Sequence, residues 1–405
     1  MRLFERVFRS RPRRAEVHGF VARGFEPVRE VFAENFRERG EIGAACAVYR
    51  RGEPLVDLWG GERDVITGSP WEEDTMVMVF STTKGMSAVA LAVAHAKGLF
   101  RYDDLVASHW PEFAQAGKAH VTVRQLLGHE AGLPAIDVPF DARMLADLDR
   151  VAVALAAQSP AWAPGTAHGY HAISLGLYEN ELLRRVDPLR RSIGGFFRDE
   201  VAKVLGVDFH IGLPETVPSH RVARIKGFHL VDTLLHMGEL PPRFVLALLD
   251  PRTITARAFG NPRIVHTEAF DAPEYRAVEL PGTNGIGTAR AVAKVYDAMA
   301  SGGEALGVGH ATFEALTAAP GPARRDEVLR IDTRFSLGFL RPSGMSEFGS
   351  SGRSFGTPGA GGSFGFADPE AGLGFAYAMN RMGFRVADDP REKALRDATY
   401  RCLGR

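Results

Sequence analysis

The stretch VFSTTKGMSAVALAVAHAKG, residues 79–98, decides how this chain folds. After Val79 and Phe80, the run that Ser81 opens is apolar nearly all the way round a helical wheel. A helix without a polar face is normally buried rather than laid on a surface. We therefore predict a helix that begins at Ser81 and stands in the middle of the molecule.

Ser81 and Lys84 are three positions apart on this helix, and such side chains share a face. The Lys84 amine can then approach the Ser81 hydroxyl, which becomes a good nucleophile only when a base takes its proton. Burial lowers the pKa of a lysine from its ordinary ~10.4 toward neutrality. Ser-x-x-Lys alone is a weak signal, but a buried, unpaired lysine is costly. We interpret Ser81 as a nucleophile and Lys84 as its activator.

Outward from this helix, both ends of the chain show strand and helix patterns. The front has a helical pattern over 17–38 and two short strands, AACAVYR (44–50) and PLVDLW (54–59). The back has a hairpin pattern, FGFADPEAGLGFAYAMN (364–380), and a helical stretch, PREKALRDATYRCL (390–403). We predict that the two ends form one antiparallel sheet with flanking helices, an α+β arrangement.

The middle of the chain is rich in helical patterns and broken by Pro and Gly. Segment 206–281 has weak periodicity and is interpreted as loops and short helices that cap a site. Thr288 is placed as the N-cap of a later helix. Helices of the middle part are predicted at 123–127, 142–158, 171–186 and 231–237.

Composition excludes several classes of protein. The 405 residues hold 49 Lys plus Arg and 49 Asp plus Glu, so no net field draws in nucleic acid. The longest apolar stretch, 85–96, is too short for a membrane span. Residues 1–14 are basic without an apolar core behind them and predict a solvated arm, not a secretory signal. With Cys46 and Cys402 as the two cysteines, we expect a cytoplasmic protein.

Five motifs in a fixed order resemble the class C β-lactamase and family VIII carboxylesterase group. The resemblance covers about residues 20–400 and is carried by VFSTTKGMSAVA (79–90), VTVRQLLGHEAGL (121–133), PGTAHGYHAISLGL (164–177), NGIGTARAVA (284–293) and FGTPGAGGSFGFADP (355–369).

The resemblance implies the β-lactamase/transpeptidase-like fold, in which terminal helices flank an antiparallel sheet and a helical lobe is inserted. It implies one catalytic domain over residues 15–405. Its α/β lobe would hold about 15–100 and 285–405, and its helical lobe about 101–284.

The same resemblance assigns site residues. Tyr170 matches the tyrosine of the family's second motif and would relay protons between Ser81, the leaving group and the attacking water. Ala172 stands where β-lactamases use an asparagine to hold the acylamino group of the drug. Its loss argues against efficient β-lactam hydrolysis. His171 either lines the pocket or has an exposed or capping role, and Asn284 is either at the pocket entrance or in a turn.

The third motif of the family is Thr357-Pro358-Gly359 here, where a Lys, His or Trp is usual. Thr357 cannot supply the positive charge that anchors a substrate carboxylate. The backbone N–H groups of Ser81 and Ala360 would form the oxyanion hole, and Gly359 would let the substrate approach the strand edge.

A second nucleophile pattern occurs twice near the C-terminus. Ser354 and Ser363 each stand in a G-x-S-x-G sequence. Neither is followed by a helical pattern, and no histidine lies beyond residue 310. We interpret both serines, and also His129, as structural. No His, Cys, Asp and Glu cluster has metal-ligand spacing, so no metal or other cofactor is implied.

We conclude from the sequence that the chain is a serine carboxylesterase acting on short-chain or neutral esters through an acyl intermediate on Ser81. A β-lactamase, an amidase or an acyltransferase could use the same Ser-Lys-Tyr site. A catalytically idle scaffold of the same fold is the alternative outside enzymes. The predicted partner is a small ester, and the oligomeric state is left open.

Overall fold

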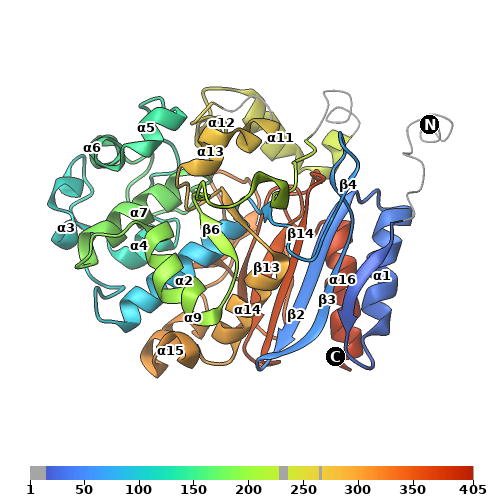
Figure 1. Cartoon of the computed structure of the whole chain (residues 1–405). Coiled ribbons are helices and arrows are strands. Elements are labelled where there is room, and N and C mark those ends of the chain that lie inside the picture. Colours follow the sequence, from blue (N-terminus) through green and yellow to red (C-terminus); the bar gives the residue numbers. More distant parts are fainter. Residues whose placement is uncertain (1–14, 228–235, 264–266, 405) are drawn as a thin grey trace.

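Both ends of the chain meet in one antiparallel sheet, as predicted (Figure 1). In this computed structural model, which describes residues 15–227, 236–263 and 267–404, the strand order is β1-β3-β2-β14-β13-β12-β11-β10, with β4 paired to β3. N-terminal and C-terminal strands join at the β2–β14 pair. The predicted arm and most of the helix predicted at 231–237 lie outside the described residues.

The strands are β1 (Val17–Val21), β2 (Gly43–Arg50), β3 (Glu53–Asp64), β4 (Ser69–Pro70), β5 (Val77–Met78), β6 (Phe209–Ile211), β7 (Gly285–Gly287), β8 (Arg324–Arg325), β9 (Asp332–Thr333), β10 (Phe335–Ser336), β11 (Phe339–Leu340), β12 (Phe355–Pro358), β13 (Phe364–Asp368) and β14 (Leu373–Met379). The α-helices are α1 (Glu26–Glu38), α2 (Thr82–Ala96), α3 (Val106–His109), α4 (Val123–Leu127), α5 (Ala142–Ala146), α6 (Leu148–Ala157), α7 (Ser174–Val186), α8 (Ile193–Phe197), α9 (Lys203–Leu205), α11 (Pro242–Leu249), α12 (Ile254–Phe259), α13 (Pro273–Ala277), α14 (Ala289–Ala300), α15 (His310–Thr317) and α16 (Pro390–Cys402).

The helix predicted over 17–38 is wrong in its first part. Residues 17–21 form the edge strand β1, which pairs with β3, and α1 begins only at Glu26. Pairing with β3 satisfies the backbone of this segment, and Gly24, at φ +90°, separates it from the helix. The helix predicted over 142–158 is also divided, because Asp147 caps the start of α6 with its side chain.

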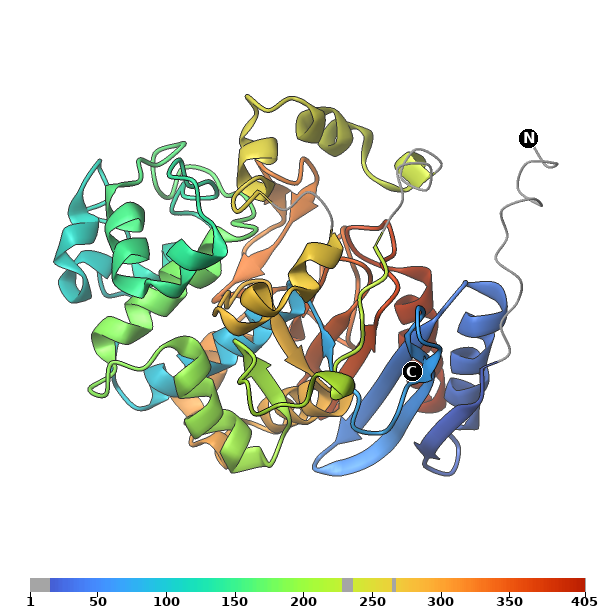
Figure 2. The ribbon, with the colours of Figure 1, turned by 45° about the horizontal axis from the view of Figure 1, so that its top comes forward.

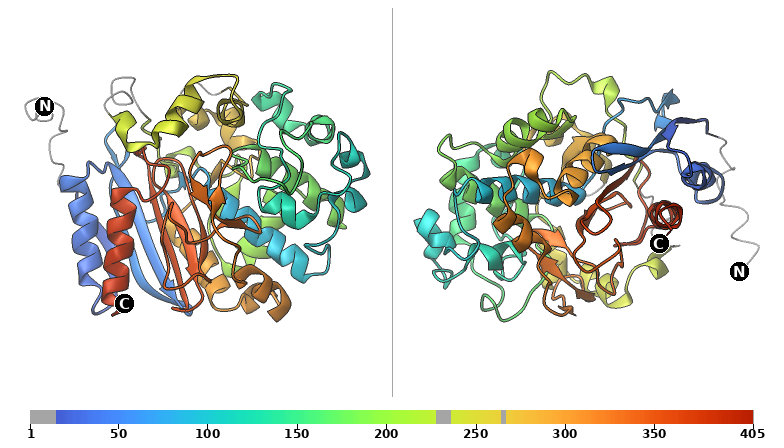
Figure 3. Two further views of the ribbon diagram at one scale, coloured as in Figure 1. Left: turned by 180° about the vertical axis from the view of Figure 1, so that it is seen from behind. Right: turned by 90° about the horizontal axis from the view of Figure 1, so that it is seen from below.

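Large and small residues separate onto the two faces of the sheet. Phe366 and Phe375 oppose each other across β13 and β14, and Phe366 stacks on Tyr400 of α16. On the other face Gly365 and Gly374 leave room for α14 to lie directly on the strands. Helices α1 and α16 cover the first face side by side (Figure 3).

The buried helix predicted after Ser81 is confirmed as α2, which runs between the sheet and the helices of the middle part of the chain (Figure 1). Every side chain from Thr82 to Ala94 is buried. The segment of α11 and α12 lies along the upper rim of the molecule in Figure 2. No described helix has the length and apolar character that crossing a membrane requires.

The contact between α14 and the sheet gives a test of the fold. A Cβ atom on Gly374 would lie 2.2 Å from the backbone nitrogen of Asp297 and 2.3 Å from the carbonyl oxygen of Ala293. Neither backbone atom can move away cheaply, so Gly374→Ala should lower the free energy of unfolding by about 1–3 kcal/mol in chemical denaturation. Gly344→Ala, at an exposed glycine with open space around it, should be neutral. Equal stability of the two variants would contradict this packing.

Candidate active site

Ser81 is presented by a constrained turn. The preceding residue, Phe80, is buried and has φ +47°, a left-handed conformation that non-glycine residues rarely adopt. The turn is fixed from β7, because Val79 donates its N–H to the Gly285 carbonyl at 2.9 Å. The Thr83 hydroxyl donates to the Phe80 carbonyl and accepts from the Gly285 N–H. The small sheet β5-β7-β6 thus holds the start of α2 in place.

The Lys84 amine has three hydrogen-bond partners. Its Nζ lies 3.2 Å from the Ser81 Oγ, 2.6 Å from the Ala172 carbonyl oxygen and 2.7 Å from the Gly282 carbonyl oxygen. Burial lowers the pKa of Lys84 to about 7, and the charge of Glu179 opposes that shift. Near neutral pH, a large share of these amines is therefore uncharged. Such an amine can donate to both carbonyls and still turn a lone pair toward Ser81.

Tyr170 lies beside this pair. The Lys84 Nζ is 4.9 Å from the centre of its ring, and a hydrogen bond with Ser81 lowers the pKa of the phenol against the larger, raising effect of burial. The ring stacks on Phe335 at 5.7 Å between centroids. Its backbone N–H donates to both carboxylate oxygens of Asp326 at 3.1 Å. Ser81, Lys84 and Tyr170, which the sequence predicted as partners, therefore meet at one place.

The turn between β12 and β13 is tied to the turn that carries Ser81. The Ser363 hydroxyl donates to the Val79 carbonyl at 2.7 Å and is 3.0 Å from the Thr82 hydroxyl. Gly359 fits closely here, since a Cβ atom on it would lie 2.3 Å from the Val79 carbonyl oxygen. Ser363 thus has the structural role that the sequence suggested.

Two backbone N–H groups are free at this junction. Within the described part of the chain, neither Ser81 nor Ala360 donates its N–H in a hydrogen bond. Ala360 is exposed and directly follows the glycine that packs against Val79. The two N–H groups fit the oxyanion hole predicted from the sequence.

Several predicted pocket residues have other roles. His171 is fully buried, with its Nδ1 bonded to the Gly169 carbonyl and its Nε2 accepting from the Leu133 N–H. Burial lowers the pKa of His171 to about 3, so it is neutral. Its ring is therefore a structural bridge between the Gly169 carbonyl and the Leu133 N–H.

Asn284 is also structural. Its amide nitrogen donates to the Tyr275 and Val278 carbonyls, and its oxygen accepts from the Leu280 N–H. The side chain holds the turn before β7 and is fully buried, so of the two predicted roles the turn is the correct one.

Thr357 and Ala172 contribute differently from the prediction. The Thr357 hydroxyl is buried beside Tyr296 and would lie 3.1 Å from a Cβ atom on Gly85, so it faces inward behind α2. Ala172 is buried and acts through its carbonyl group, which accepts from Lys84. His129, interpreted as structural, accepts the His171 N–H on its Nδ1.

Comparison with known proteins agrees with this geometry. Residues 28–399 match the model of the Beta-lactamase family. The chain belongs to this family. It is 34% identical over 376 residues to a protein described as "Esterase/beta-lactamase LipL" of Mycobacterium tuberculosis, covering 90% of this chain and 83% of that protein. The fold class and the family resemblance predicted from the sequence are confirmed.

Solved structures of the family superpose over nearly the whole chain. One titled as a family VIII carboxylesterase has a TM-score of 0.85 at 38% identity and covers 96% of this chain and 100% of its own. A penicillin-binding protein homologue from Caulobacter crescentus has a TM-score of 0.81 at 36% identity, with coverage of 96% and 100%.

Sequence reasoning missed residues that support the site from other parts of this family fold. Asp326 holds the backbone of Tyr170, Gly282 accepts from Lys84, and Phe335 packs on Tyr170. Glu179 is a buried carboxyl whose charge acts on Lys84. None of these four belongs to a local motif. The described residues contain no group of three or more His, Cys, Asp or Glu side chains that could hold a metal.

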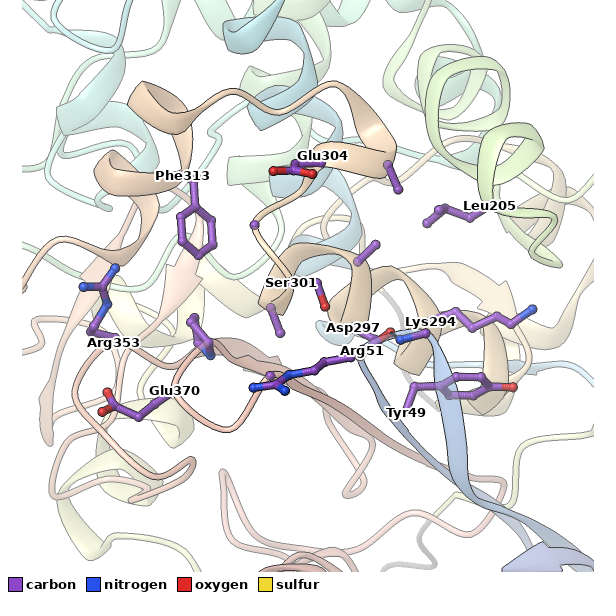
Figure 4. A pocket seen from close by; sticks show the side chains of 17 residues that line it. Tyr49, Arg51, Leu205, Lys294, Asp297, Ser301, Glu304, Phe313, Arg353 and Glu370 are labelled. Atoms are coloured by element: carbon purple, nitrogen blue, oxygen red, sulfur yellow. Dashed lines mark hydrogen bonds between the residues drawn. The ribbon is translucent and has the colours of Figure 1, made fainter. Parts of the chain in front are cut away.

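A wide pocket lies away from Ser81. It measures about 820 Å³ and is lined by residues of the β2–β3 turn, the end of α14 and the β13–β14 turn (Figure 4). Asp297 in its wall accepts the Gly52 N–H at 2.7 Å and so holds the β2–β3 turn. Ser81, Lys84 and Tyr170 do not line this pocket.

The carboxylate that anchors Tyr170 gives a second prediction. Asp326 is fully buried and accepts backbone N–H groups from Tyr170, Val328 and Leu329. Asp326→Asn places an amide NH₂ among these donors, and we expect a loss of about 1–3 kcal/mol in the free energy of unfolding. We also expect a lower kcat/KM, because Tyr170 is released.

Asp297→Asn is the matched control, because Asp297 also holds backbone at a turn but does so beside the remote pocket. It should reduce stability without reducing kcat/KM per folded molecule. An Asp326→Asn enzyme with wild-type kcat/KM would show that Asp326 does not position Tyr170.

Proposed function

We propose that this chain is a serine carboxylesterase that hydrolyses neutral esters of short-chain acids through an acyl intermediate on Ser81. The observation that carries the proposal is the Lys84 amine, held by the Ala172 and Gly282 carbonyls and within 3.2 Å of the Ser81 hydroxyl. The similarity to proteins described as an esterase and as a family VIII carboxylesterase supports the same reaction class.

Acylation follows from this arrangement. The Ser81 oxygen attacks the ester carbonyl carbon while its proton passes to the neutral Lys84 amine. The N–H groups of Ser81 and Ala360 stabilise the negative charge on the carbonyl oxygen. The carbon–oxygen bond to the alcohol then breaks, and the alkoxide takes a proton from the Tyr170 phenol. Lys84 returns its proton to Tyr170, and an ester of Ser81 remains.

Deacylation uses the same groups in reverse. Water attacks the acyl carbon and gives a proton to the Lys84 and Tyr170 pair, and the same two N–H groups hold the oxyanion. Collapse breaks the bond to the Ser81 oxygen, which takes the proton back. The carboxylic acid leaves, and the enzyme returns to its starting protonation.

The site favours neutral substrates, because it lacks two polar groups that bind charged or amide-bearing substrates in the family. Ala172 cannot make the amide contact of the family's asparagine, and the inward-facing Thr357 hydroxyl carries no charge for a substrate carboxylate. A β-lactamase is the second candidate, because a relative described as an esterase/beta-lactamase is 34% identical to this chain over 83% of its own length. Amidase and acyltransferase activity use the same intermediate with another leaving group or acceptor.

We further place the enzyme in the cytoplasm. The support is the cysteine pattern, in which Cys46 is buried and neither Cys46 nor Cys402 forms a disulfide. Fractionation of cells that produce the protein tests this placement, and recovery outside the cytoplasmic fraction would contradict it.

The protonation state of Lys84 makes the catalytic activity depend on pH. The base is the neutral amine, so proton binding below a pKa of about 7 removes it. We expect kcat/KM for p-nitrophenyl butyrate to fall about tenfold per pH unit on the acid side of that value. Lys84→Arg should be inactive throughout, since a guanidinium does not lose its proton in this range. A profile that is flat down to pH about 5 would contradict a lysine base.

The substrate class is tested by a panel of esters and lactams. We expect kcat/KM for p-nitrophenyl butyrate to exceed that for nitrocefin by about a hundredfold or more, because the β-lactam loses its polar contacts. The reverse ratio would favour the β-lactamase, and competition by added alcohols would reveal acyl transfer.

Ser81→Ala should abolish all of these activities and also labelling by a fluorophosphonate, which reacts with activated serines. Wild-type protein that is not labelled at Ser81 would favour the idle scaffold. Activity retained in Ser81→Ala would exclude the mechanism.

A further inference from the structure

Glu179 on α7 is a buried carboxyl group for which the mechanism above has no use. It is fully buried, and neither carboxylate oxygen has a hydrogen-bond partner among the described residues. An unpartnered carboxylate away from water is strongly unfavourable. Either the group stays protonated, or a nearby positive charge stabilises its ionised form.

The packing of α7 on α2 places Glu179 close to Lys84. Gly176 of α7 lies directly against Gly282, whose carbonyl accepts from Lys84. Glu179 is three residues further along α7 and therefore on the same side of the helix. On α2, Ala88 follows Lys84 by one turn.

Gly338 packs between α2 and Glu179, so its contacts show where the Glu179 carboxyl group lies. A Cβ atom on Gly338 would lie 2.8 Å from the Ala88 Cβ and 3.4 Å from the Glu179 Oε1. The carboxyl group therefore lies beside α2 near Ala88, one helical turn along the chain from Lys84.

The charges of Glu179 and Lys84 act on each other. Burial raises the pKa of Glu179, and the positive charge of Lys84 opposes that rise. Burial lowers the pKa of Lys84 to about 7, against the opposing effect of the Glu179 charge. The negative charge of Glu179 and the positive charge of Lys84 therefore each favour the charged form of the other group.

The other titratable groups around Lys84 do not carry a negative charge there. His129 and His171 are neutral, because burial lowers the pKa of each. Burial raises the pKa of both the Tyr170 and Tyr296 phenols, so these remain protonated. Among the described residues, Glu179 is the acidic group whose charge acts on the Lys84 ammonium.

We propose that Glu179 is a positioning residue for the reaction at Ser81, whose carboxylate supplies the negative charge that the Lys84 ammonium faces once it has taken the Ser81 proton. This inference rests on the proposed function, since it takes Lys84 as the base. The proton moves from the Ser81 Oγ to the Lys84 Nζ, and Glu179 neither gives nor takes a proton in this step. Its effect is electrostatic.

The test is the pH dependence of Ser81 labelling by a fluorophosphonate, together with kcat/KM for p-nitrophenyl butyrate. Glu179→Gln keeps the shape of the side chain and removes its charge, so Lys84 holds its proton less firmly. We expect the maximal rates to fall about tenfold and the half-maximal pH to move down by about half a unit or more. A rate profile that coincides with the wild-type profile would overturn the proposal.

Glu181→Gln is the matched control. Glu181 is a buried carboxylate on the same helix, but it pairs with Arg184 and Arg185 instead of Lys84. This variant should lose stability and keep the wild-type half-maximal pH. The same pH shift in both variants would show that the effect comes from α7 in general and would overturn the proposal.

A measurement on the wild-type protein covers the case in which Glu179→Gln does not fold. In wild-type protein with ¹³C-labelled glutamate, the carboxyl signal of Glu179 should titrate over the pH range in which the labelling rate rises. A Glu179 that stays protonated throughout that range would overturn the proposal. Wild-type protein that the probe does not label would instead overturn the esterase mechanism itself.

Discussion

Burial of the Lys84 amine is the constraint on which the rest of the structure depends. An ammonium group inside a protein is unstable unless acceptors surround it. Here the carbonyls of Ala172 and Gly282 and the hydroxyl of Ser81 do so. These acceptors come from three parts of the chain that are far apart in sequence. The site can form only when those parts have packed around α2.

The same constraint explains why glycines stand at the closest contacts around α2. Gly85, next to Lys84, faces the Tyr296 hydroxyl, and a Cβ atom there would lie 1.8 Å from it. Gly176 and Gly282 approach each other directly, and Gly359 packs on the Val79 carbonyl. Gly176, Gly282 and Gly359 let backbone segments come close together, whereas Gly85 makes room for the Tyr296 side chain. The catalytic geometry is thus built largely from main-chain atoms.

Short sequence patterns correctly predicted those features that depend on residues close together in the sequence. The apolar run after Ser81 predicted α2, the Ser-x-x-Lys spacing predicted the contact of Ser81 with Lys84, and the hairpin near the C-terminus was recovered as β13 and β14. The edge strand β1 was missed because its pairing with β3 is a tertiary contact that overrides a helical pattern. Asp326 was missed for the same kind of reason, since its carboxylate meets the Tyr170 N–H across 156 positions of sequence.

The roles of side chains within one recognised motif were harder to predict from the sequence. His171 stands next to Tyr170, yet its ring points away into a backbone bridge between Gly169 and Leu133. Neighbouring residues in a non-helical turn point in different directions, so proximity in sequence does not imply a shared pocket. Glu179 shows the converse, because helical spacing from Gly176 brings it toward Lys84 although no motif includes it. Whether a residue lies near Lys84 is therefore set by the face of α7 on which it stands. Its distance from Tyr170 along the sequence matters less.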